Sequence, residues 1–196
     1  MFAAIAAAWQ AYKAPGTAIL AIDGRCGSGK TTLAGVLGRL LPCTVLHMDD
    51  FFQPPALRTK ERLARAGENI HHERFLQEVL LPLSEGRPAE LRRFDCATGT
   101  FLDAVPIPPA KLYVVEGSYS LHPSLFPHYT HRLFLDIPPE EQKKRLLARE
   151  GEEGIAPFLE RWIPLEEAYF NACGLPGKAG VVTLGITERG FLGGNE

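Results

Sequence analysis

The sequence predicts an α/β domain in which a five-stranded parallel sheet is flanked by helices. Short, nearly continuous apolar runs recur along the chain, and segments with a helical spacing of apolar residues separate them. Such runs are typical of strands that are buried on both faces of a parallel sheet. The expected strands span residues 17–23, 43–48, 111–115, 131–135 and 180–184.

A glycine-rich loop follows the first expected strand and matches the pattern G-x-x-x-x-G-K-[ST]. A helix is expected directly after it, over residues 32–41, so the loop has the flanks that a phosphate cradle requires. Lys30 is expected to reach the β- and γ-phosphates of ATP, and the Thr31 hydroxyl to bind Mg²⁺. The predicted cradle consists of Gly24, Cys26, Gly27, Ser28, Gly29, Lys30, Thr31 and Thr32.

Three acidic residues follow expected strands whose carboxyl ends lie on the same edge of the sheet as the loop. Phosphoryl transfer to a hydroxyl needs a carboxylate that orients the alcohol and takes its proton. Asp49 and Asp50 are both candidates for this base, and adjacent strand-end residues point in different directions, so only one is expected to face the phosphates. Glu116 is expected to hold a Mg²⁺-bound water.

A long interval between the second and third expected strands, about residues 53–108, has a different character. It predicts a short charged helix over 59–66, an amphipathic helix over 73–81 that ends near Pro82, and a small hairpin over 88–100. Long connections of this kind often carry function, so we expect an acceptor site here, although a merely structural insertion is the alternative. Arg74 could meet the acceptor or lie on the surface.

A charged segment after the fourth expected strand predicts a lid, about residues 145–157. A helix begins at Pro138, a glycine-bounded break covers 150–154, and a second helix over 155–170 is expected to be interrupted near Pro164. Arg145 and Arg149 lie one turn apart and could both reach a bound nucleotide, but a solvated face with an i,i+4 pair from Glu141 gives the same pattern.

The composition narrows the range of partners. With 21 basic and 23 acidic side chains the net charge is −2, so nucleic acids and acidic membranes are not expected as partners. The four cysteines form no C-x-x-C pair, which argues against a zinc site and a disulfide framework and favours the cytoplasm. The apolar run at 2–8 is expected to be an alanine-rich helix packed on a soluble domain, and residues 190–196 to be loosely ordered.

Taken together, these motifs resemble the uridine kinase and phosphoribulokinase-like branch of P-loop kinases, from about residue 19 to residue 184. The resemblance implies ATP- and Mg²⁺-dependent phosphorylation of a primary hydroxyl, with Asp49 as the base and Lys30 and the two lid arginines on the phosphates. It is carried by residues 24–32, Met48-Asp49-Asp50-Phe51-Phe52, residues 69–75, Arg93-Phe94-Asp95, residues 114–117 and the Arg145/Arg149 helix. The acceptor residues that it implies are Asp49, Phe52, Arg74, Phe94 and Asp95.

The sequence leaves the identity of the acceptor open. Uridine kinases carry an aspartate where this chain has His71, and a histidine where it has Gly99. We therefore expect a small-metabolite kinase over residues 1–196, with a nucleoside as the first acceptor candidate. The alternatives are a nucleotide, nicotinamide riboside or a pantothenate-like acceptor, or a non-catalytic nucleotide-binding module. The sequence also leaves open whether the protein forms a homo-oligomer.

Overall fold

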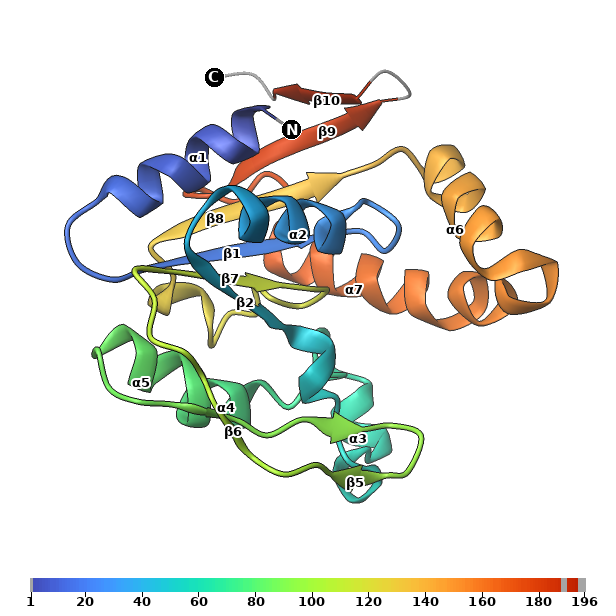
Figure 1. Cartoon of the computed structure of the whole chain (residues 1–196). Helices are drawn as coiled ribbons and strands as arrows, with labels where there is room; N and C mark the ends of the chain where they lie inside the picture. The colour runs from blue at the N-terminus through green and yellow to red at the C-terminus, as the bar shows by residue number, and fades with distance from the viewer. Residues whose placement is uncertain (1, 188–189, 194–196) are drawn as a thin grey trace.

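The computed structural model describes residues 2–187 and 190–193, and its centre is a six-stranded sheet with the order β10-β9-β8-β1-β7-β2 (Figure 1). The strands are β1 (Ala18–Gly24), β2 (Cys43–His47), β7 (Leu112–Glu116), β8 (His131–Asp136), β9 (Val182–Thr187) and β10 (Gly190–Gly193). Five of them run parallel, as the sequence predicts. The sixth, β10, pairs antiparallel with β9, so the expectation of a loosely ordered end was wrong for Gly190–Gly193, and residues 194–196 lie outside the described part.

Strand β1 is the middle of the sheet, and all seven of its residues are buried. It pairs with β7 on one side and β8 on the other. Ile19 and Ala21 face one apolar core, whereas Leu20 and Ile22 face another. The continuous apolar run therefore reflects a strand that is covered on both faces.

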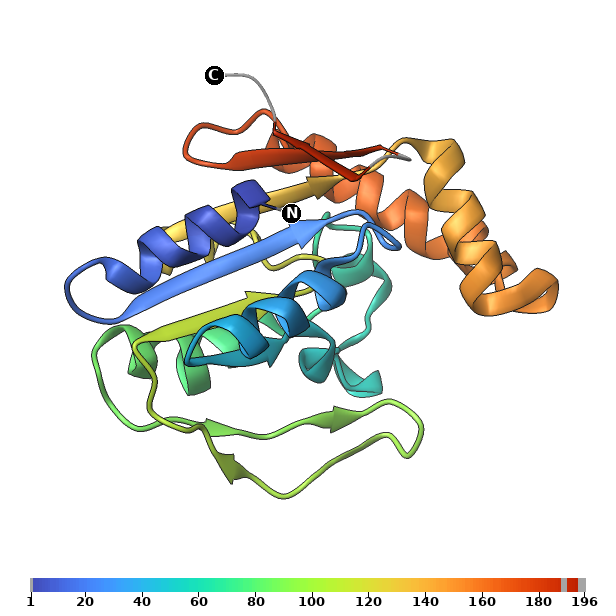
Figure 2. The same ribbon diagram turned by 45° about the horizontal axis from the view of Figure 1, so that its top comes forward.

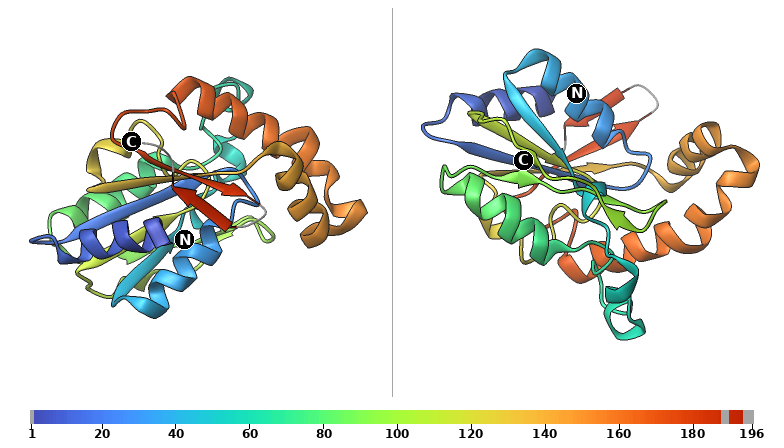
Figure 3. Two further views of the ribbon diagram at one scale, coloured as in Figure 1. Left: turned by 90° about the horizontal axis from the view of Figure 1, so that it is seen from above. Right: turned by 60° about the horizontal axis from the view of Figure 1, so that its bottom comes forward.

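Helices α1 (Phe2–Lys13) and α2 (Lys30–Leu40) cover one face of the sheet, in front of it in Figure 2. The buried side chains of α1 are all alanine, which lets the helix backbone approach the strands closely. Helix α7 (Ile163–Cys173) covers the opposite face, and the view from above in Figure 3 separates the two layers.

The segment between β2 and β7 forms a helical layer and a long hairpin at the bottom of Figure 1. Its helices are η1 (Met48–Phe51), η2 (Pro55–Leu57), α3 (Lys60–Leu63), α4 (His72–Phe75), η3 (Leu76–Leu80) and α5 (Leu81–Ser84). The hairpin pairs β3 (Glu90–Leu91) with β6 (Val105–Pro106) and β4 (Phe94–Asp95) with β5 (Thr100–Phe101). The apolar side chains Phe75, Val79 and Leu80 pack this segment on the same core as α7.

Two helices continue past prolines at which the sequence predicts an interruption. The helical segment over 72–84 runs through Pro82, and η5 (Phe158–Trp162) continues into α7 through Pro164. In both cases a wide π-type turn ends two residues before the proline. The wider turn makes room for the ring and for the missing N–H, so the proline does not end the helix.

Helix α6 (Pro139–Gly154) extends beyond the carboxyl end of β8 and turns back toward α7 (Figure 1). Its backbone is non-helical at Gly151, where φ is 77° and ψ is 177°, so the predicted break is a kink at one glycine. The chain also has the short helix η4 (Phe126–His128) after β7. In the described part of the chain, no helix combines the length and the apolar character needed to cross a bilayer.

Candidate active site

The glycine-rich loop joins β1 to α2 and is held by close contact with the neighbouring strand. Gly24 has a φ of 139°, and a Cβ atom at this position would lie 2.2 Å from the carbonyl oxygen of Leu135 in β8. Gly29, at the start of α2, has a φ of 91°. Because side chains are strained or excluded at these two positions, glycine is required for the loop to turn under the helix N-terminus.

Lys30 is folded onto the loop. Its Nζ donates to the carbonyl oxygens of Gly24 at 2.7 Å and Arg25 at 3.0 Å, and the residue is 8 % exposed. The ammonium group thus lies over the loop. In this motif the lysine binds phosphate oxygens from this position. Backbone carbonyls are weaker partners for a cation than phosphate oxygens, so a ligand can displace them.

The loop opens into a cavity of about 580 Å³ at the carboxyl edge of the sheet. The residues that line it come from the loop, from the ends of β2 and β7, and from α6, η5 and α7. They are Cys26, Gly27, Gly29, Lys30, Thr31, Thr32, Asp49, Phe52, Glu116, Gly117, Ser118, Tyr119, Arg145, Arg149, Phe158, Trp162 and Glu166. Most of the predicted nucleotide-binding residues therefore meet in one place, although Gly24 and Ser28 do not line the cavity.

Asp49 and Asp50 separate in the structure. Asp49 lines the cavity, and partial loss of solvent raises the pKa of its carboxyl group, while the charge of Lys30 opposes the rise. Asp50 forms an ion pair with Arg93, its Oδ2 lying 3.4 Å from the Arg93 Nε, and it does not line the cavity. The 3₁₀ turn of η1 gives the two neighbouring side chains these different directions. Asp49 is therefore the better placed of the two predicted bases.

Glu116 and Thr31 form the second polar group of the cavity. The Thr31 hydroxyl lies 3.2 Å from both carboxylate oxygens of Glu116. His47, on the neighbouring strand, lies with its Nδ1 2.5 Å from Glu116 Oε1, and this hydrogen bond raises the pKa of the imidazole. A hydroxyl and a buried carboxylate beside a phosphate site are the oxygen donors that Mg²⁺ uses, directly or through water, so the residues fit this ion.

The two lid arginines line the cavity and also form the ion pairs that a charged helix face predicts. Arg145 Nε lies 2.7 Å from Glu141 Oε1, and Arg149 Nε lies 2.6 Å from Glu150 Oε1. The i,i+4 pair of Arg145 with Glu141 that the sequence predicts is thus present, and the role of the two arginines in nucleotide binding stays a prediction. The pairs hold the guanidinium groups at the cavity wall, from where they can exchange a carboxylate for a phosphate.

The residues predicted for the acceptor divide into two groups. Phe52 lines the cavity, with its ring centroid 6.3 Å from that of Trp162. Arg74 lies instead over the rings of Phe51 and Phe101, and its guanidinium donates to the carbonyl oxygen of Arg92 at 2.6 Å. It stabilises the packing of the helical layer against the hairpin.

Phe94 and Asp95 also lie away from the cavity. Phe94 is buried against Phe101 in the hairpin. Asp95 accepts hydrogen bonds from the Ala97 amide at 2.8 Å and the Thr98 hydroxyl at 3.0 Å, so it stabilises the turn of the hairpin. The structure does not bring Arg74, Phe94 or Asp95 to the cavity, and their role in acceptor binding stays a prediction.

Two buried carboxylates that the sequence reasoning missed support the loop. Asp23, at the end of β1, accepts hydrogen bonds from the Gly24 and Leu121 amides and the Tyr169 hydroxyl, and burial raises its pKa to about 6. Glu166 accepts from the Cys26 amide at 2.9 Å. Burial and the charge of Glu166 raise the pKa of the Cys26 thiol to about 12, so this thiol is neutral. The sequence does contain a signal for Glu166, since this acidic residue lies on α7 between the apolar residues Ile163 and Tyr169.

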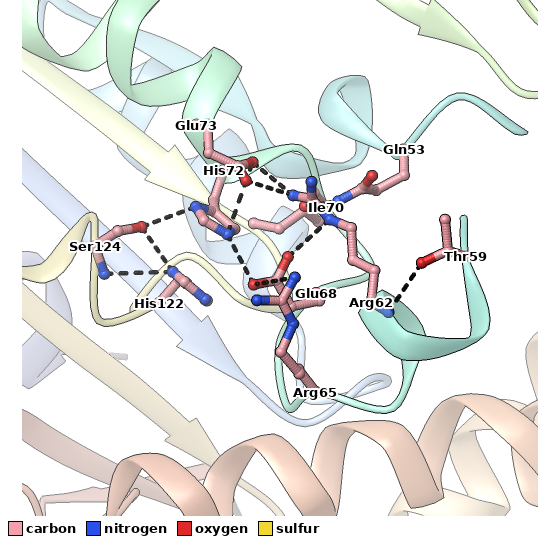
Figure 4. Close-up of polar contacts among 10 residues, drawn as sticks. All are labelled: Gln53, Thr59, Arg62, Arg65, Glu68, Ile70, His72, Glu73, His122 and Ser124. Atoms are coloured by element: carbon pink, nitrogen blue, oxygen red, sulfur yellow. Dashed lines mark hydrogen bonds and ion pairs between the residues drawn. The ribbon is translucent and has the colours of Figure 1, made fainter. Parts of the chain in front are cut away.

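Glu68, His72 and His122 form a polar cluster outside the cavity (Figure 4). The two imidazole rings are stacked, with centroids 3.9 Å apart and planes 18° from parallel, and both Nδ1 atoms contact Ser124. A metal ion must lie near the plane of each ring at about 2 Å from its nitrogen, and nearly parallel stacked rings do not allow this. The negative charge of Glu68 is already balanced by Arg62, whose Nε lies 2.8 Å from Glu68 Oε2. The cluster therefore connects α4 to the loop after β7.

The fold and the cavity define a class of protein: a phosphate loop beneath a parallel sheet edge, a carboxylate across from it and arginines on a lid are the parts of a P-loop kinase. No protein-family model matches the chain. The chain is 31 % identical over 138 residues to nicotinamide riboside kinase 2 of Mus musculus, and the match covers 67 % of each of the two chains. It is also 31 % identical to nicotinamide riboside kinase 2 of Homo sapiens, and this match covers 57 % of the human protein. The chain therefore belongs to the uridine kinase and phosphoribulokinase-like family of P-loop kinases, a family of ATP-using small-molecule kinases.

Solved structures show the same fold. A candidate uridine kinase from Bacillus stearothermophilus superposes with a TM-score of 0.67 over 92 % of this chain and 95 % of its own, at 22 % identity. A candidate P-loop kinase from Saccharomyces cerevisiae with a circular permutation gives 0.69 over 95 % and 98 %, at 11 % identity. At these identities the likeness concerns the fold alone.

Proposed function

We propose that the protein transfers the γ-phosphoryl group of Mg·ATP to the primary hydroxyl of a ribonucleoside, with nicotinamide riboside as the first acceptor candidate. The observation that carries the proposal is the common cavity: the phosphate loop forms one wall, and Asp49 lies on the same cavity with its carboxylate accessible. A kinase needs both a phosphate cradle and a proton acceptor within reach of one bound acceptor.

The residues divide the chemical work as follows. The loop amides, the start of α2 and Lys30 bind the phosphates, and Arg145 and Arg149 neutralise charge on the transferring group. Thr31 and Glu116 would hold Mg²⁺, which shields the phosphate oxygens when it is bound.

Asp49 orients the acceptor hydroxyl and accepts its proton as the bond from the hydroxyl oxygen to the γ-phosphorus forms and the bond to the ADP oxygen breaks. A base must be ionised to act. Because the pKa of Asp49 is raised, the loss of activity on acidification should begin at a higher pH than the ordinary pKa of an aspartate would give. The positive charge of Lys30 limits this shift.

The choice of acceptor rests on the relatives and on the aromatic side chains of the cavity lining. The two curated relatives are named as nicotinamide riboside kinases. The cavity lining includes the aromatic side chains Phe52, Tyr119, Phe158 and Trp162, which suit a flat heteroaromatic ring. Within the described residues, the cavity lining has no amide or imidazole side chain that could read the edge of a pyrimidine, so uridine is the second candidate.

An acceptor panel tests the proposal. ADP release with Mg·ATP would be followed for nicotinamide riboside, uridine, cytidine, a nucleoside monophosphate and pantothenate, with the Lys30→Ala protein as background. We expect acceptor-stimulated turnover with nicotinamide riboside at a kcat/KM at least about ten times that of uridine. ATP binding without turnover on any of the five would favour a nucleotide-binding regulatory module instead.

A further inference from the structure

Gln142 is a buried polar side chain that the proposed chemistry does not use. It lies in the first turn of α6, is 2 % exposed and does not line the cavity. Its Nε2 donates to the carbonyl oxygen of Cys26 at 3.0 Å and lies 3.1 Å from the Cys26 sulfur. Because Cys26 belongs to the phosphate loop, this hydrogen bond ties the helix that carries the two lid arginines directly to the loop.

The backbone of Cys26 is held from two sides. Its carbonyl group accepts from Gln142 of α6, and its N–H group donates to the Glu166 carboxylate of α7 at 2.9 Å. Both polar groups of this loop residue are therefore satisfied by side chains that lie 116 and 140 residues away in the sequence. Since a buried backbone group without a partner is costly, these two hydrogen bonds fix the position of Cys26 relative to both helices.

A second contact between α6 and the loop lies one turn further along the helix. Leu146 is 0 % exposed, and a Cβ atom added to Gly27 would lie 3.5 Å from the Leu146 Cγ, which is an ordinary contact distance. Gln142 and Leu146 are four residues apart, so they share one face of the helix. Helix α6 therefore rests on two successive loop residues, through one polar and one apolar contact.

Arg145 and Arg149 lie on the same side of α6 as these contacts. With 3.6 residues per turn, positions 142, 145, 146 and 149 fall within an arc of roughly 100°. The two arginines line the cavity and pair with Glu141 and Glu150 of the same helix. These pairs direct the guanidinium groups but do not determine how far the helix lies from the loop. That distance depends on the contacts that the helix makes with the loop.

We infer that Gln142 is a positioning residue: by tying α6 to the Cys26 carbonyl, it sets the place of Arg145 and Arg149 relative to the γ-phosphate. This inference deepens the proposed function and rests on it for the role of the arginines. Charge neutralisation on a transferring group depends steeply on position, so a small displacement of the helix weakens it. The competing roles for Gln142 are shaping of the phosphate loop and simple packing of α6.

The test compares nucleotide binding by Gln142→Met and by the wild type. Methionine has a similar length and suits a buried position, but it cannot donate to the Cys26 carbonyl. Calorimetric titration with Mg²⁺ and either ADP or the non-hydrolysable analogue AMP-PNP measures affinity without and with the γ-phosphate. We expect the Kd for AMP-PNP to rise about 5- to 20-fold and the Kd for ADP to stay within about twofold. Gln10→Met, at an exposed position of α1, is the matched control and should change neither.

The same substitution in an Arg145→Ala/Arg149→Ala background shows whether Gln142 acts through the arginines. Adding Gln142→Met there should change the Kd for AMP-PNP less than about twofold, because no guanidinium group remains to be positioned. Gln142→Asn keeps an amide that is one methylene shorter, and it should show the same pattern in milder form. Equal losses of ADP and AMP-PNP affinity that persist without the arginines would overturn the inference in favour of loop shaping. Unchanged affinities would overturn it in favour of packing alone.

This readout needs no acceptor, so it separates the inference from the proposed reaction. With an acceptor that the panel identifies, the kcat of Gln142→Met should fall about 10- to 100-fold while the acceptor KM stays within about twofold. Binding of both nucleotides without turnover on any acceptor would reject the proposed reaction, and the ratio of the two Kd values would still decide the inference. Turnover together with an unchanged ratio in Gln142→Met would reject the inference alone.

Discussion

The two ends of the cavity are built in different ways. The phosphate end is one contiguous stretch, in which backbone amides and Lys30 act within a few residues of each other. The aromatic side chains of the lining, which we call the aromatic end, come from the residue after η1, the loop after β7 and η5, and the first and last of them lie more than a hundred residues apart in the sequence. Phosphate recognition therefore depends on local backbone geometry, whereas acceptor recognition depends on how distant elements pack. Substitutions should separate the two ends.

The largest effect is expected at the phosphate end, from Lys30→Ala. The ammonium group is the main cation over the loop, so its loss should lower turnover by about 10³-fold or more, to the level of the background, with any acceptor. Coupled ADP release measures this. Lys60→Ala, at an exposed position of α3, is the matched control and should leave the rate unchanged. Full turnover by Lys30→Ala would show that the loop is not the nucleotide site.

Asp49→Asn should stop phosphoryl transfer between the two ends of the cavity and leave each end able to bind its ligand. Without the carboxylate no side chain takes the proton, so kcat should fall by roughly two to four orders of magnitude, while the affinity for ATP stays within a few-fold. Single-turnover kinetics and a nucleotide-binding titration provide the two readouts.

Asp50→Asn is the control for this variant, because Asp50 pairs with Arg93 outside the cavity. Its charge contributes to the raised pKa of Asp49. The variant should therefore keep most of its activity and shift the acid limb of kcat/KM to lower pH. If Asp50→Asn loses activity and Asp49→Asn does not, the base is Asp50.

Gly24→Ala should act on the phosphate end by lowering the stability of the fold. The added Cβ would overlap the Leu135 carbonyl oxygen, and alanine is strained at a φ of 139°. We expect a loss of about 3–5 kcal/mol in the free energy of unfolding. Gly16→Ala shares a positive φ but meets nothing within 4 Å, so it should cost about 1 kcal/mol. Chemical denaturation compares the two, and equal losses would show that the contact with β8 is not tight.

The same contrast explains which parts of the fold could be predicted from the sequence. The five parallel strands were predictable because each is a buried apolar run, and the loop because its glycines act locally. Strand β10 was missed because it is short and begins and ends with glycine. The continuation of the helices through Pro82 and Pro164 depends on wide turns that no composition rule reveals.

The site was predictable in proportion to how local it is. The choice between Asp49 and Asp50 depends on the turn of η1, which the sequence leaves open. Glu166 belongs to no motif and becomes part of the site only because α7 packs beside the loop. Phe94 and Asp95 were named from the family resemblance, but the pairing of β4 with β5 places them in the hairpin itself.

The smallest effect is expected from Asp95→Ala, which tests whether the hairpin belongs to the aromatic end. Loss of the hydrogen bonds to Ala97 and Thr98 should cost about 0.5–1.5 kcal/mol of stability, because the turn is exposed. The KM for the acceptor should change less than about twofold, since the carboxylate is bonded within its own turn. Asp103→Ala, at an exposed position of the same hairpin, controls for the loss of one negative charge. A tenfold rise in the acceptor KM for Asp95→Ala alone would mean that the hairpin closes over the bound acceptor. The acceptor site would then include the residues that the resemblance implies, and the aromatic end would be only part of it.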